Sequence, residues 1–331
     1  MFSYRLPDFK YPVYSVNFNP NSKTLYNQSG SNTLDEIENL IKSNNFIILD
    51  FNRDHPNFIL GNTSITEVFN YFSNNGLKNI FYLTSENIPN HEYIRFFPSW
   101  LYQKSREYST IDMNIKTDRT YSLSCLNRFP SPHRIYIFYH LLQKKYFPLC
   151  LTSFLGLTNP YNNFNEIGEF NDIYSEIPNE IKSYYQKTKF TKKLAEDTYY
   201  WTNDHNPIHS AYNDSYLNLI TESTYYHSFF TEKTAKALTG EQLFILAGGQ
   251  SSITNLKSLG FECFEKINYI YDDVENWIKR MDSILNLLDN IFFNIQDLYW
   301  IYSKERKYNR EYFLSDNFRR KCLQQVKDLL K

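Results

Sequence analysis

The chain has 331 residues and a formal net charge of −1, with 35 Lys and Arg against 36 Asp and Glu. At ~150 residues per domain, this length predicts about two domains. The balanced charge argues against a globally basic nucleic-acid coat and against an acidic solvating tail. The 29 Tyr and 27 Phe, with only 9 Gly, exclude a disordered or low-complexity chain.

Two further features bear on location and on metals. The N-terminal segment lacks the basic and apolar regions of a signal peptide, and no later stretch approaches the ~18 consecutive apolar residues of a membrane helix, so we expect a cytoplasmic protein. The four cysteines are far apart and show neither C-x-x-C nor zinc-type histidine spacing. We therefore expect buried free thiols and no metal site at Cys125, Cys150, Cys263 and Cys322.

Apolar segments alternate with amphipathic ones, which is typical of βα units around a parallel sheet. In the first third we predict helices at 34–41 and 65–72, each followed by a strand, at 46–51 and 79–84. Ligands of open α/β sheets bind beyond the carboxyl ends of strands. Asp50, Asp54 and Glu86 are polar residues at or just beyond such strand ends, and all three are candidates.

A second block begins near Thr120 with a predicted strand that ends in Asn127 and Arg128. A helix follows, with Ser131 as N-cap and Pro132 at its first position, which places Arg134 in the first turn. Residues 158–214 are rich in Asn, Tyr and Asp, and we interpret them as loops and short helices.

The most regular pattern lies further on. We predict a strand at 216–222, a helix at 231–238 capped by Thr231, a strand at 242–249 that ends in Gly248 and Gly249, and a helix at 251–261. From 273 onward the pattern is helical.

The commonest nucleotide and hydrolase motifs are absent: the chain has no G-x-G-x-x-G, Walker A, G-x-S-x-G, H-E-x-x-H or D-x-D. Two predicted helix starts carry a cation instead, Arg134 and Lys233. A cation beside exposed helix N–H groups suits a diphosphate, and a glycine pair lets backbone approach a nucleotide closely. Taken singly, each feature also has an ordinary structural explanation, as a paired arginine, a capped helix start or a tight turn.

Three segments resemble alpha-1,3-fucosyltransferases. FYLTSENIPN with YIRFFPSWLY (81–102) is similar to a strand with a T-G-E-N-like turn, and SLSCLNRFPSPHRIYIFYHLL (122–142) to the strand, loop and helix that carry a donor-binding arginine. The blocks YLNLITES, FFTEKTAKAL and QLFILAGGQSSITNL resemble the family's F-E-N, I-T-E-K and P-V-V-L-G elements. The order of L-N-R-x-x-x-x-H-R and T-E-K-T is closer to a broad group of bacterial and viral glycosyltransferases.

The resemblance implies roles for individual residues. Glu86 matches the catalytic base, Arg134 and Lys233 the phosphate-binding pair, and Glu232 the ribose-binding carboxylate. Glu222 matches the F-E-N glutamate, and Asn127, Arg128, Gly248 and Gly249 complete the donor-binding set. The chain departs from the family at Ser85 and Ser223, where the family has Gly and Asn.

The resemblance also implies a GT-B-like α/β fold, in which two Rossmann-like domains face a central cleft. We expect an N-terminal acceptor-side domain at 1–115, a nucleotide-sugar-binding domain at 116–282 and C-terminal helices at 283–331. The implied activity is an inverting, metal-independent transfer of a sugar, fucose-like by resemblance, from a nucleotide-sugar such as a GDP-sugar to a hydroxyl of a glycan acceptor. No separate cofactor is expected.

Two alternatives of a different kind stay open. A viral enzyme that glycosylates hydroxymethylated bases in DNA would share the donor chemistry and need a basic track, for which Lys144, Lys145, Lys189, Lys192, Lys193 and the 304–310 region are candidates. A non-catalytic sugar- or nucleotide-binding module would use aromatic loops, such as Tyr199 to Trp201, as stacking surfaces.

Overall fold

The computed structural model describes residues 94–127, 130–154, 175–188 and 210–329, and, before residue 94, the strands named below. The chain forms two compact units: residues 1–103 with 320–331 make the first, and residues 104–319 make the second. The boundaries expected from sequence, 1–115, 116–282 and 283–331, stay predictions. Among the described residues, no helix is both long enough and apolar enough to cross a membrane.

The first unit contains a parallel sheet in the order β1-β5-β6-β8. Its strands are β1 (Val13–Ser15), β5 (Ile47–Phe51), β6 (Ile80–Thr84) and β8 (Ile94–Phe96). A small antiparallel sheet holds β2 (Phe18–Asn19), β3 (Thr24–Asn27) and β4 (Gly30–Thr33). The strands expected at 46–51 and 79–84 are confirmed, and the helices expected at 34–41 and 65–72 lie outside the described residues.

The second unit is built on a four-stranded parallel sheet in the order β10-β9-β11-β13. The central strand β11 is buried along its whole length, as expected for a parallel sheet covered on both faces. The strands are β9 (Tyr121–Asn127), β10 (Cys150–Phe154), β11 (Ser215–Thr221) and β13 (Leu243–Ala247). Three of them were expected from the sequence, and β10 was not.

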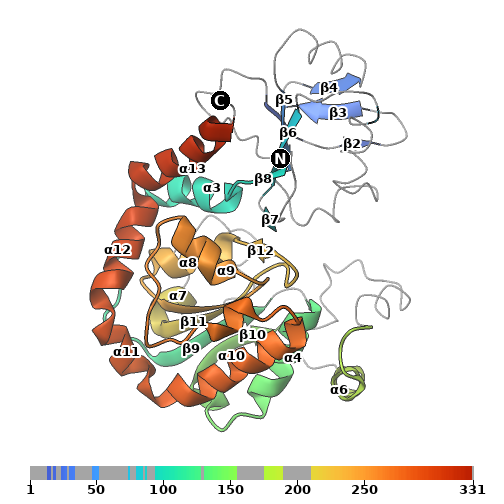
Figure 1. Ribbon diagram of the computed structural model, residues 1–331. Coiled ribbons are helices and arrows are strands. Elements are labelled where there is room, and N and C mark those ends of the chain that lie inside the picture. Colours follow the sequence, from blue (N-terminus) through green and yellow to red (C-terminus); the bar gives the residue numbers. More distant parts are fainter. Residues whose placement is uncertain are drawn as a thin grey trace. The chain divides into compact units, whose positions relative to one another are not determined.

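Helices cover both faces of this sheet (Figure 1). The crossover helix α4 (Pro132–Leu142) links β9 to β10 and packs against α10 (Trp277–Ile291). The second crossover helix, α8 (Glu232–Thr239), links β11 to β13 and packs against α12 (Ser303–Leu314). The two crossovers run in opposite directions along the sheet, and because such connections are right-handed, their helices lie on opposite faces.

The remaining elements are shorter or peripheral. They are α3 (Ser99–Tyr108), β7 (Glu86–Asn87), η2 (Phe147–Leu149), α6 (Asn179–Thr188), α7 (Ser210–Asp214), β12 (Ser228–Phe229), α9 (Ser252–Ser258), η3 (Ile270–Asp273), η4 (Phe292–Asn294), α11 (Ile295–Ile301) and α13 (Asp316–Leu329).

The expected free thiols are confirmed, and the expected burial is confirmed at three of the four cysteines. All four cysteines are free, and Cys125, Cys150 and Cys322 are buried while Cys263 is partly exposed. Burial raises the pKa of Cys125 to about 12, so this thiol is uncharged at neutral pH.

Two tyrosines cover the free edge of β13. The Tyr271 hydroxyl accepts the backbone N–H of Leu246 at 3.1 Å, and the Tyr269 hydroxyl donates to the carbonyl of Phe244 at 3.1 Å. Tyr271 is only 1% exposed. Side-chain hydroxyls thus take the place of a further strand and satisfy backbone groups that would otherwise lie unpaired at the edge.

We expect Tyr271→Phe to lower the free energy of unfolding by ~1–3 kcal/mol, because it leaves the buried N–H of Leu246 without an acceptor. Urea unfolding monitored by circular dichroism measures the difference. Tyr308→Phe is the matched control: its hydroxyl bonds the Gly260 carbonyl from an exposed position, so we expect a change within ~0.5 kcal/mol. Equal effects of the two substitutions would contradict the role of Tyr271.

Candidate functional site

The order of the second sheet reverses between β9 and β11. From β9 the chain crosses to β10 on one side, whereas from β11 it crosses to β13 on the other. In open α/β sheets, ligands bind beyond the carboxyl ends of the strands at such a reversal. We call this region, at the ends of β9, β11 and β13, the carboxyl edge.

The two strands that flank the reversal are joined at their ends by side chains. Thr221, the last residue of β11, donates its hydroxyl to the Asn127 side-chain oxygen at 2.5 Å. The Asn127 amide lies 3.3 Å from the Cys125 sulfur, and both Asn127 and Thr221 are 1% exposed. Asn127 therefore lies at the carboxyl edge as expected, while Arg128 lies outside the described residues.

Glu222 follows β11 directly and is 1% exposed. One carboxylate oxygen accepts the Thr231 N–H at 3.0 Å and the Thr234 hydroxyl at 2.5 Å, and the other accepts the Thr231 hydroxyl at 2.6 Å. These donors belong to the start of α8, so the Glu222 carboxylate caps that helix. Its sequence-based assignment to hydroxyls of a donor stays a prediction.

The start of α4 is bonded to the same residue. Arg134, only 3% exposed, donates from Nη2 to the carbonyls of Thr221 and Glu222, each at 3.0 Å. His133 Nε2 also contacts the Glu222 carbonyl at 2.8 Å. A carbonyl only accepts, so Nε2 carries the proton and Nδ1 accepts from the Ser131 hydroxyl at 3.3 Å.

Complete burial, and next the neighbouring Arg134, lower the pKa of His133 well below its ordinary value. The imidazole is therefore neutral at physiological pH. Since its N–H is committed to a carbonyl and its ring is fully buried, His133 fixes the geometry of the edge and has no proton to exchange with a ligand.

The first turn of α8 carries a lysine and a glutamate that are paired. Lys233 Nζ lies 3.0 Å from a Glu232 oxygen and 3.3 Å from the Thr231 hydroxyl, and the Lys233 and Glu232 side chains are 17% and 23% exposed. Burial alone would raise the pKa of Glu232, but Lys233 and Lys236 lower it to about 2. The Glu232 carboxylate is therefore charged at neutral pH. An ammonium has three donors, so these two contacts leave one for a ligand.

The glycine turn after β13 lies against the loop that follows β11. A Cβ on Gly248 would lie 3.4 Å from the Cβ of Glu222, and one on Gly249 would overlap the backbone carbonyl of His227. The Ser252 hydroxyl donates to the Gly249 carbonyl at 2.7 Å, and Ser251 takes a left-handed conformation with φ of 62°. The turn therefore requires close approach of backbone at Gly249.

Arg280 is hydrogen-bonded to the backbone of this turn. The side chain is 1% exposed and donates to four backbone carbonyls: Nε to Gly248 at 3.1 Å, and the Nη groups to Val274, Glu275 and Tyr225. It joins the loop after β11, the turn after β13 and the start of α10.

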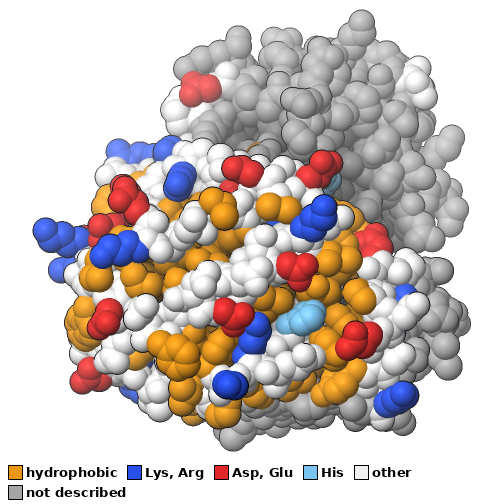
Figure 2. All heavy atoms as spheres, turned by 60° about the horizontal axis from the view of Figure 1, so that its bottom comes forward, with side chains coloured by type: hydrophobic (Ala, Val, Ile, Leu, Met, Phe, Trp, Pro, Cys, Tyr) orange, Lys and Arg blue, Asp and Glu red, His pale blue; other side chains and the backbone are white. Residues whose placement is uncertain are grey.

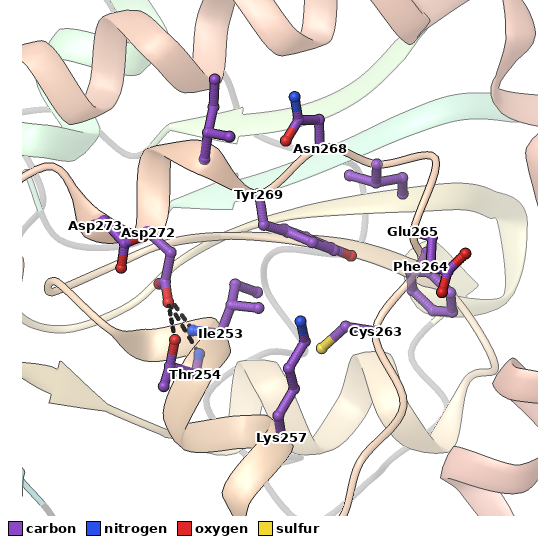
Figure 3. A pocket seen from close by; sticks show the side chains of 12 residues that line it. Ile253, Thr254, Lys257, Cys263, Phe264, Glu265, Asn268, Tyr269, Asp272 and Asp273 are labelled. Atoms are coloured by element: carbon purple, nitrogen blue, oxygen red, sulfur yellow. Dashed lines mark hydrogen bonds between the residues drawn. The ribbon is translucent and has the colours of Figure 1, made fainter.

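A separate hollow of about 390 Å³ lies between α9 and residues 263–273 (Figure 3). Lys257 points into it, with Tyr269 and Cys263 on the opposite wall. Asp272 is buried beside it and caps α9, accepting the N–H groups of Ile253 and Thr254 at 2.9 Å each. None of the residues predicted to form the donor site lines this hollow.

The predicted residues thus divide into three groups. In the first group, Glu222 is hydrogen-bonded to Arg134 and to the start of α8, whose first turn carries Glu232 and Lys233. Asn127, Gly248 and Gly249 lie at the same edge. Glu86 lies in β7 of the first unit, and nothing is described of its side chain. Arg128 is outside the described residues. His133 and Thr234 were not predicted as parts of the site, and no local motif marks their hydrogen-bond partners.

Four of the described basic residues that were candidates for a DNA track are paired with carboxylates, and Lys189, Lys192 and Lys193 lie outside the described residues. Lys144 contacts Asp289 at 2.6 Å, Arg306 and Arg310 contact Glu241, and Lys307 contacts Glu311. On the face shown in Figure 2, positive and negative side chains alternate. Within the described part of the chain, no group of three or more His, Cys, Asp or Glu is arranged to hold a metal ion.

Comparison with known proteins adds a likeness in backbone structure. No family model and no curated protein matches the sequence. Among solved structures, a crystal structure of an alpha-1,3-fucosyltransferase matches with a TM-score of 0.42 and 12% identity, over 98% of this chain and 79% of that one. The score is low, and it assigns neither a fold family nor an activity to this chain.

We expect Gly249→Ala to be strongly destabilising and Gly248→Ala to be mild. The first adds a methyl group where the His227 backbone lies, whereas the second places it at ordinary to tight contact with Glu222 and Ser252. Backbone cannot yield as a flexible side chain does, so we expect ~2 kcal/mol or more for Gly249→Ala and under ~1 kcal/mol for Gly248→Ala. Chemical unfolding of both variants compares them, and equal losses would refute the close approach at Gly249.

We expect Glu232→Gln to flatten the acid limb of the stability profile. The pKa of Glu232 is lowered from 4.5 to about 2 in the folded protein, so its carboxylate contributes stability above pH ~4.5 that is lost as the pH falls toward 2. The difference in unfolding free energy between wild type and variant should therefore shrink over that interval. Urea titrations at a series of pH values test this, and parallel profiles would contradict it.

Proposed function

We propose that the protein is a nucleotide-sugar-dependent glycosyltransferase. The proposal rests on one observation: two helix starts that carry cations are both hydrogen-bonded to Glu222. The Glu222 carbonyl accepts a hydrogen bond from Arg134, and its carboxylate accepts one from the start of α8, next to Lys233. These contacts lie where the strand order of a parallel sheet reverses. A diphosphate is the ligand whose charge and geometry suit that combination.

In this proposal, the diphosphate of the donor binds at the carboxyl edge. Lys233 supplies its remaining N–H donor, and Arg134 adds a fixed positive charge behind the edge. These fixed charges stabilise the negative charge that develops on the leaving nucleoside diphosphate, without a metal. The partly exposed Glu232 carboxylate accepts hydroxyls of the ribose, while the buried Glu222 keeps α8 in position.

The reacting hydroxyl belongs to a glycan acceptor. Glu86 is proposed as the general base that removes its proton as the oxygen attacks the anomeric carbon, which gives inversion at that carbon. A base within hydrogen-bond reach contributes about 10²–10⁴ in rate. The sugar is fucose-like and the nucleotide a GDP-sugar by the sequence resemblance alone.

We expect one nucleoside diphosphate to raise the melting temperature by several degrees in a thermal-shift screen of GDP, UDP and CMP with their common sugars. A ligand at ~100 times its Kd adds ~2.7 kcal/mol to the folded state. Chelator should leave the shift unchanged, and Lys233→Ala should abolish it. Glu86→Gln should keep the shift in melting temperature. Transfer of the sugar to glycans is then assayed with this variant.

The control for this screen is Lys307→Ala, which removes a lysine that is exposed on α12. Its melting temperature, and the increase that the nucleotide produces, should match those of the wild type. Absence of a shift with every nucleotide would overturn the proposal, and a shift that vanishes with chelator would overturn its metal-independent form.

A further inference from the structure

Tyr226 is an exposed aromatic residue beside the candidate site. It lies in the loop that follows Glu222 and precedes β12, and it is 47% exposed, whereas the adjacent Tyr225 is 6% exposed. The Tyr225 ring centroid lies 5.1 Å from that of His133, which bonds the Glu222 carbonyl. The Tyr225 ring therefore lies between Tyr226 and His133 at the carboxyl edge.

The Tyr226 ring is fixed in place by its hydroxyl. That hydroxyl donates to Glu176 at 2.9 Å and accepts from the Tyr225 hydroxyl at 2.9 Å. Glu176 also accepts the indole N–H of Trp277 at 2.9 Å. Burial, and then the Glu176 carboxylate, raise the pKa of Tyr226, so the phenol stays protonated and keeps donating.

The backbone that carries the ring is fixed as well. Arg280 donates to the Tyr225 carbonyl, and the Tyr226 N–H donates to the Thr224 hydroxyl at 3.2 Å. The Tyr225 ring lies 4.3 Å from the Tyr226 ring, centroid to centroid, and supports it. An exposed ring whose rotamer and backbone are both held before any ligand arrives loses little entropy when a ligand stacks on it.

We propose that Tyr226 is the stacking surface for the nucleobase of the bound nucleotide. The inference rests on the proposed function and extends it from the diphosphate to the base. Every nucleobase has a flat π-face, and aromatic side chains bind such faces with ~1–3 kcal/mol per base. Tyr226 lies in the segment between Glu222 and α8, so the proposed base and diphosphate sites share this segment of the chain.

The experiment compares ligands with and without a base. Binding of GDP, UDP and inorganic pyrophosphate is measured by calorimetry on wild type and on Tyr226→Ala. We expect the substitution to weaken the affinity for whichever nucleoside diphosphate the wild type binds by about tenfold. The affinity for pyrophosphate should be unchanged, because pyrophosphate has no base to stack. Tyr226→Phe keeps the ring, and its affinity for the nucleotide should be within about threefold of that of the wild type. That ratio corresponds to a smaller free energy than one typical hydrogen bond contributes.

Tyr308→Ala is the matched control. Tyr308 is 43% exposed and its hydroxyl is also hydrogen-bonded, to the Gly260 carbonyl, but it lies on α12. It should leave both affinities unchanged. Tyr226→Leu serves as a second variant if the alanine variant fails to fold, with the same expected loss.

Three outcomes overturn the inference, and they differ from one another. Unchanged nucleotide affinity in Tyr226→Ala refutes stacking while the proposed function stands. An equal loss for pyrophosphate shows that Tyr226 acts on the diphosphate site or on its structure, and not on a base. If wild type binds neither nucleotides nor pyrophosphate, the proposed function itself fails, and the inference fails with it.

Discussion

The architecture of the second unit depends on one buried carboxylate and the carbonyl beside it. Glu222 is 1% exposed, yet it accepts donors from the start of α8 through its side chain and from α4 through its backbone. A buried acidic side chain is tolerated in such a place because each of its oxygens has a hydrogen-bond donor. The same bonds align two helix starts with the end of the central strand, so stability and the shape of the candidate site have a common origin.

This arrangement explains why the site is rigid in its centre and accessible at its margin. His133, Arg134 and Arg280 are all buried and commit their donors to backbone carbonyls. Lys233, Glu232 and Tyr226 keep part of their surface exposed. The inner residues therefore hold the loops, and the outer residues present charge and an aromatic ring to solvent, which is the division expected of a preorganised binding site.

Local signals in the sequence were enough to predict much of this unit. Pro132 after Ser131, and Thr231 before Glu232, predicted the starts of α4 and α8, because caps and first-turn residues act within a few positions. Strand β10 was missed because its buried Thr152 and Ser153 hide its apolar pattern. The partners of Glu222, Arg280 and Glu176 could not be predicted, since nothing local says which distant carbonyl or hydroxyl a polar side chain will meet. Arg134, predicted from its first-turn position, was found with backbone carbonyls as partners for Nη2.

The tyrosines along β13 bear on how the protein behaves in a crowded solution. An open strand edge is a template on which a second chain can add its own strand, and repeated addition leads to aggregates. Tyr269 and Tyr271 occupy the backbone groups of Phe244 and Leu246 that such an intruding strand would use. Phenolic hydroxyls cannot pass the hydrogen-bond ladder on to a neighbour, so on this side the sheet ends within the molecule.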